Sequence, residues 1–94
     1  MNSDSLTLRQ FQKHISDRYE QADRARGTPG TWLHFSEEIG ELARALARHD
    51  RLNLEEEFAD VIAWLCTLAN INDVDLATAV ARKYLGEDPP KGTK

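Results

Sequence analysis

The sequence predicts an all-α fold: a four-helix bundle whose core is completed by oligomerisation. Apolar residues recur every three or four positions in four segments, which is the spacing of one helix face. Glycine, proline and polar residues separate these segments. The 94 residues suffice for one domain but for only a modest core, which favours association with further copies. We expect residues 1–86 to form this domain and residues 87–94, rich in proline and glycine, to form a flexible tail.

The first predicted helix covers residues 6–24. Thr7 stands at its start and Gln10 follows three residues later, which is the pattern of a capping box. One face of this helix is apolar and carries Leu8, Phe11, Ile15 and Tyr19. Residues 26–30, Arg-Gly-Thr-Pro-Gly, are predicted to end the helix in a loop.

The second and third predicted helices form the centre of the bundle. The second covers residues 31–49, and its apolar stripe consists of Trp32, Phe35, Ile39, Leu42 and Leu46. After a short connection, Asn53 is predicted to cap the third helix, with Glu56 at the capping-box position. This helix ends near Ile71, and its apolar residues are Leu54, Phe58, Val61, Ile62, Leu65 and Leu68.

A short fourth helix is predicted near the end of the domain. It begins at Asp73 or Asp75, both of which are suitable capping residues, and ends near Tyr84. Gly86 then stops the helical pattern.

The composition excludes several classes of function. The net charge of −4 argues against a nucleic-acid-binding surface. No apolar stretch is long enough to span a membrane, and the N-terminus lacks the pattern of a signal peptide, so we expect a cytoplasmic protein. Cys66 is the single cysteine; it lies in an apolar run and is predicted to be a small buried hydrophobic residue.

Two pairs of acidic residues stand out: Glu38 with Glu41, and Glu57 with Asp60. Eight of the 16 acidic residues lie between Glu37 and Asp60. At about 100° per residue, the two members of each pair project about 60° and 120° from their apolar stripe, on the same side in both helices. On antiparallel neighbouring helices, the four carboxylates would therefore share one small volume.

Two interpretations of these pairs are open. They are solvated carboxylates on the surface of an acidic bundle, or they bind a cation. The second is favoured because the pairs border the apolar stripes, where an unpaired carboxylate is costly. In addition, the third helix has no lysine or arginine between Leu52 and Asn70. Hard carboxylate oxygens suit Mg²⁺, with Mn²⁺ as a substitute.

The same residues resemble a known family. The segment Glu38-Ile39-Gly40-Glu41-Leu42, followed by residues 56–62, Glu-Glu-Phe-Ala-Asp-Val-Ile, is similar to the ExxE and ExxD motifs of the MazG-like nucleotide pyrophosphohydrolases. The similarity to small single-domain members extends over roughly residues 8–85. It also includes Phe11-Gln12, Arg24-Ala25-Arg26-Gly27, Leu68-Ala69-Asn70, Val74-Asp75-Leu76 and Lys83-Tyr84.

This resemblance implies an all-α homodimer or homotetramer that uses Mg²⁺ to hydrolyse a (deoxy)nucleoside triphosphate to the monophosphate and pyrophosphate. It implies that Glu38, Glu41, Glu57 and Asp60 are the catalytic metal ligands, and that the protein removes non-standard nucleotides or controls dNTP pools. The alternative is a non-enzymatic acidic helical module that binds a basic protein partner. Such a module would not need both acidic pairs beside the apolar stripes.

Four further residues are candidates for substrate binding, each with a structural alternative. Lys83, a position where relatives have a lysine, is a candidate phosphate ligand or a solvated residue at a helix end. Arg26 either reaches phosphates or belongs to a surface loop. Asn70 either binds substrate or caps a helix. Trp64, four residues after Asp60, either stacks on a base or packs within the bundle or a dimer.

Overall fold

Three helices account for most of the computed structural model, which describes residues 2–86. They are α1 (Leu8–Arg48), α2 (Arg51–Ile71) and α3 (Leu76–Tyr84). No strand occurs among the described residues, so the all-α prediction is confirmed. The predicted tail, residues 87–94, lies outside them. None of the described helices is long and apolar enough to cross a membrane.

Helix α1 is bent at Gly27, the one residue inside it with non-helical dihedral angles (φ 81°, ψ 174°). The sequence predicts a loop over residues 26–30, but the helix resumes directly after the glycine. Pro29 is compatible with this because it lies in the first turn of the new segment, where a backbone N–H has no helical acceptor in any case. Residues 2–86 therefore form three helices, the first of them bent, where the sequence predicts four.

The starts of α1 and α3 agree with the predictions, and the start of α2 differs. Thr7 and Gln10 form the predicted capping box at the start of α1. The predicted cap of the next helix at Asn53 is wrong. Asp50 caps α2 instead, and its carboxylate accepts a hydrogen bond from the backbone N–H of Asn53 at 3.3 Å. Asp75, one of the two predicted starts, is the N-cap residue of α3.

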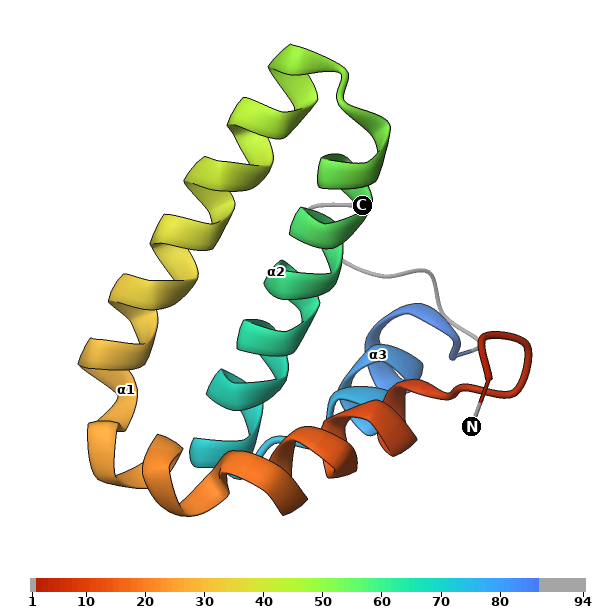
Figure 1. The fold of residues 1–94 in the computed structure, drawn as a ribbon. Helices are drawn as coiled ribbons and strands as arrows, with labels where there is room; N and C mark the ends of the chain where they lie inside the picture. Colours follow the sequence, from red (N-terminus) through yellow and green to blue (C-terminus); the bar gives the residue numbers. More distant parts are fainter. Residues whose placement is uncertain (1, 87–94) are drawn as a thin grey trace.

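The bend in α1 determines the arrangement of the helices. After Gly27, α1 runs antiparallel to α2, and before it the N-terminal half of α1 passes the end of α2 and contacts α3 (Figure 1). The buried Gln12 side chain joins all three helices. Its amide donates to the carbonyl of Val74 at 2.7 Å and to Asn70 Oδ1 at 3.0 Å, and accepts from the N–H of Leu76 at 2.9 Å.

The core of the single chain is small. Its buried apolar residues are Ile15, Phe35, Ala45, Cys66 and Ala69. The prediction that Cys66 is buried is thus confirmed. Other residues of the predicted stripes are exposed in the single chain, namely Ile39, Leu46, Phe58, Ile62 and Leu65. One chain therefore covers only part of the apolar surface that the sequence assigns to the core.

Candidate metal centre

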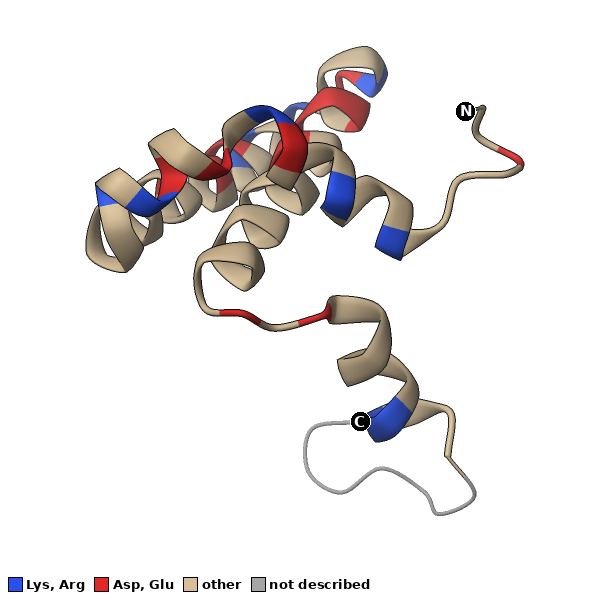
Figure 2. Cartoon of the chain, turned by 90° about the horizontal axis from the view of Figure 1, so that it is seen from below, with Lys and Arg blue, Asp and Glu red and all other residues tan. Residues whose placement is uncertain are grey.

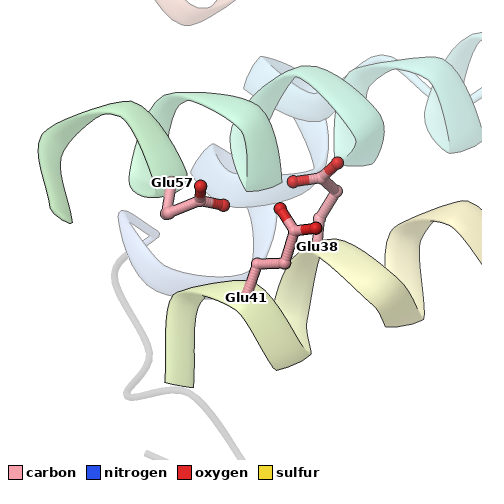
Figure 3. A group of neighbouring side chains, drawn as sticks. All are labelled: Glu38, Glu41 and Glu57. Atoms are coloured by element: carbon pink, nitrogen blue, oxygen red, sulfur yellow. The ribbon is translucent and has the colours of Figure 1, made fainter. Parts of the chain in front are cut away.

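Three of the four predicted carboxylates meet between α1 and α2. One oxygen from each of Glu38, Glu41 and Glu57 lies within 4.8 Å of the others. Glu38 and Glu41 extend from α1 towards α2, and Glu57 extends from α2 towards α1 (Figure 3). The antiparallel course of the two helices after Gly27 brings the pairs together, because both lie on the same flank of their apolar stripes.

The fourth predicted carboxylate, Asp60, is an exposed residue three positions after Glu57 on α2. It does not belong to the group that lies within 4.8 Å. Its negative charge nevertheless contributes to raising the pKa of both Glu38 and Glu57. Asp60 is thus an electrostatic neighbour of the three-carboxylate group.

The three-carboxylate group is electrostatically unsatisfied. Partial burial, followed by the charges of neighbouring carboxylates, raises the pKa of Glu38 and of Glu57 above the ordinary value. One oxygen of each, Oε2, is buried and has no hydrogen-bond partner among the described residues. None of the ion pairs within residues 2–86 involves Glu38, Glu41, Glu57 or Asp60. A bound cation would offset the repulsion among these like charges.

The residues fit a hard divalent ion. All donors are carboxylate oxygens, which Mg²⁺ and Mn²⁺ prefer over the nitrogen and sulfur ligands typical of zinc sites. The two buried oxygens without a hydrogen-bond partner agree with such a site, because a buried polar atom without a partner costs free energy.

An aromatic pair lies next to the carboxylates. The rings of His34 and Trp64 are stacked, with centroids 4.9 Å apart and planes 16° apart. His34 precedes Glu38 by one turn of α1, and Trp64 follows Asp60 by one turn of α2. His34 was not predicted as a site residue from the sequence. Its spacing was a usable signal, because His34 precedes Glu38 by four residues just as Trp64 follows Asp60 by four.

The Arg26 side chain also approaches the Trp64 ring. In the sequence, Arg26 precedes His34, whereas Glu38 and Glu41 follow it. The guanidinium carbon of Arg26 is 5.1 Å from the centroid of the Trp64 ring. The guanidinium also donates to Asp23 Oδ1 at 2.9 Å and to Thr31 Oγ1 at 3.1 Å. The structure thus brings two of the predicted substrate-binding residues, Arg26 and Trp64, into contact.

The buried residue Asp23 was not predicted from the sequence. Its Oδ2 accepts a hydrogen bond from the hydroxyl of Thr67 at 3.2 Å, across 44 residues of sequence. A signal was present, because Asp23 continues the apolar spacing of Ile15 and Tyr19 in steps of four residues. An acidic residue at such a position is expected to be buried and paired.

The other two predicted substrate-binding residues lie elsewhere. The Asn70 side chain is engaged by Gln12 on both of its polar atoms. Lys83 lies on α3, whose charged residues are all basic (Figure 2), and its Nζ is 5.2 Å from the Tyr84 ring centroid. The structure does not bring either side chain into the three-carboxylate group.

A comparison with protein families gives one match. Residues 29–89, more than half of the chain, match the family model of the MazG nucleotide pyrophosphohydrolase domain. The matched segment contains all four predicted carboxylates and begins after the bend in α1. A search among curated proteins found no match.

Proposed function

The chain belongs to the MazG nucleotide pyrophosphohydrolase family, and we propose that it hydrolyses (deoxy)nucleoside triphosphates to the monophosphate and pyrophosphate in a Mg²⁺-dependent reaction. The observation that carries this proposal is the three-carboxylate group, with its two unpaired buried oxygens. The proposed activity is suited to a role in removing non-standard nucleotides or in controlling dNTP pools, and we include that role in the proposal.

In this proposal, Glu38, Glu41 and Glu57 hold the ion, and Asp60 completes the set of ligands. Mg²⁺ bound there would neutralise phosphate charge and lower the pKa of a bound water, and Mn²⁺ would be a substitute. Four ligands leave room for one or more ions, because Mg²⁺ keeps several of its waters. Glu38 and Glu41 are the candidates for the general base that accepts a proton from the attacking water.

The sugar and base of the substrate are proposed to lie beside Trp64 and Arg26. Trp64 is about one helical turn from Asp60, the nearest of the four carboxylates on its helix. The Trp64 ring already contacts His34 and Arg26, so a base that stacks on it takes the place of one of these groups. The roles of Lys83 and Asn70 in substrate binding stay predictions.

We propose that the protein is a homodimer or homotetramer. Support comes from the apolar residues left exposed in the single chain, among them Ile39 (45%), Leu46 (48%) and Phe58 (50%). A small domain gains stability when such residues are covered by another copy. Sedimentation of a monomer at micromolar concentration would contradict the oligomer without affecting the proposed chemistry.

A panel of (d)NTPs, assayed for pyrophosphate release with Mg²⁺, tests the proposed activity. Glu57→Gln is expected to abolish turnover because it removes a charged oxygen ligand while keeping the shape of the side chain. Glu56→Gln is the matched control, since Glu56 is the adjacent residue and is exposed; it is expected to keep most of the activity. Equal activity of the two variants would remove Glu57 from the site.

A further inference from the structure

A cavity of about 350 Å³ lies between the N-terminal half of α1 and helix α2. Much of its wall is aromatic or apolar, formed by Ile15, Tyr19, Ala63 and Trp64. The remaining wall is polar and comes from Asp23, Arg26 and Thr67. Apolar walls with a few fixed polar groups are typical of sites that bind a small organic molecule.

The cavity and the three-carboxylate group lie along the same interface between α1 and α2. Going from the carboxylates towards the aromatic pair, α1 presents Glu41, Glu38 and then His34. In the same direction, the antiparallel helix α2 presents Glu57, Asp60 and then Trp64. Four residues of helix correspond to about 6 Å along the axis. Trp64, which lines the cavity, is therefore about one turn from the nearest carboxylate of its own helix. A nucleotide whose phosphates lie at the carboxylates would direct its base towards this cavity.

The polar wall is held in a defined geometry. Asp23 is only 4% exposed, and each of its oxygens has one hydrogen-bond donor: Arg26 Nη2 for Oδ1 and Thr67 Oγ1 for Oδ2. The partners of Arg26 hold it in turn, because its second nitrogen donates to the buried Thr31 hydroxyl. An ionised carboxylate has about four acceptor sites, so Asp23 retains the capacity to accept from a ligand.

We infer that this cavity takes the base of the substrate and that Asp23 selects bases that present an exocyclic amino group. This inference rests on the proposed function. An amino group donates a hydrogen bond to the carboxylate. A carbonyl at the same position would place two acceptors together without a proton between them, which a buried site rejects strongly. Cytosine is thus favoured over uracil, and adenine over hypoxanthine.

Isosteric substrate pairs test the inference, because they differ in the amino and carbonyl groups and hardly in size. We expect kcat/KM with Mg²⁺ to be at least about tenfold higher for dCTP than for dUTP, and for dATP than for dITP. Asp23→Asn, which replaces one acceptor by a donor, is expected to reduce both ratios to near one. Asp17→Asn is the matched control, since Asp17 lies on the same helix, is exposed and pairs with Lys13; it is expected to keep both ratios.

Each outcome of this experiment decides the inference. Wild-type ratios near one would overturn it while leaving the proposed hydrolase activity in place, and they decide the matter even if Asp23→Asn does not fold. An equal loss of kcat/KM for all four substrates in Asp23→Asn would show that Asp23 is only structural. If the wild type hydrolyses no nucleotide, the proposed function fails, and calorimetric binding of dCMP and dUMP then decides. Stronger binding of dCMP supports the inference, and equal or absent binding overturns it.

Discussion

Replacing Gly27 by alanine is expected to lower the free energy of unfolding by about 1–3 kcal/mol. The dihedral angles of this residue, φ 81° and ψ 174°, lie in a region that essentially only glycine occupies. A Cβ added there would have Pro29 Cδ as its nearest neighbour, at 3.9 Å, which is an ordinary van der Waals contact. The cost therefore comes from the backbone conformation and not from a clash.

Gly40 provides the matched control for this substitution. It lies inside the helical part of α1, and a Cβ added there would meet nothing within 4 Å. Gly40→Ala is thus expected to raise the free energy of unfolding by about 0.5–1 kcal/mol. The same chemical change has opposite signs at the two positions, and the two variants should differ by about 1.5–4 kcal/mol.

Urea unfolding followed by far-UV circular dichroism measures both effects, with all proteins at one concentration because an oligomer's stability depends on it. In a thermal scan, each kcal/mol corresponds to a shift in Tm of about 4–8 °C for a domain of this size. A Gly27→Ala variant as stable as the wild type would refute the bend described for α1. So would a Gly27→Ala variant that is more stable than the wild type.

Three further predictions concern the remaining structure. Gln12→Ala is expected to lower the free energy of unfolding by about 1–3 kcal/mol in the same urea assay, because the N–H of Leu76 and Oδ1 of Asn70 lose their side-chain partner. An unchanged midpoint would contradict this. The second prediction concerns the metal-free protein in EDTA, in which folding raises the pKa of Glu38 and Glu57. At pH values between the ordinary and the raised pKa, the folded protein therefore binds more protons than the unfolded protein. The wild type should therefore lose stability as pH rises through the raised pKa, and Glu57→Gln should lose less. Parallel curves of Tm against pH for the two proteins would contradict this prediction. Millimolar Mg²⁺ should raise the Tm of the wild type and leave that of Glu57→Gln nearly unchanged, and equal shifts would remove Glu57 from the ligands.

The meeting of the carboxylates could be predicted because it depends on local geometry. The spacing of Glu38 from Glu41, and of Glu57 from Asp60, sets the direction of each side chain on its helix. The separation of Asp60 from the closest group could not, since it depends on the rotation and offset of one helix against the other. The contact between Asp23 and Thr67 was likewise beyond local pattern, because 44 residues separate them and neither belongs to a motif.

The helix boundaries show the same limit. Asp50 and Asn53 are both good capping residues, and only the path of the chain between α1 and α2 decides that Asp50 is the cap. The segment around Gly27 and Pro29 predicts a loop, yet a single glycine with positive φ is enough to turn the chain. The apolar stripes were predictable, and the small size of the domain predicts that further copies of the chain cover the part that one chain leaves exposed.

The products formed from a nucleoside triphosphate test the central claim most directly. Phosphorus NMR of a dNTP incubated with the protein and Mg²⁺ distinguishes cleavage between the α- and β-phosphates from cleavage at the γ-phosphate. The account predicts monophosphate and pyrophosphate in equal amounts, with no products when EDTA replaces the metal or when Glu57→Gln replaces the wild type. Release of orthophosphate and a diphosphate, or no turnover of any nucleotide at millimolar Mg²⁺ or Mn²⁺, would contradict it.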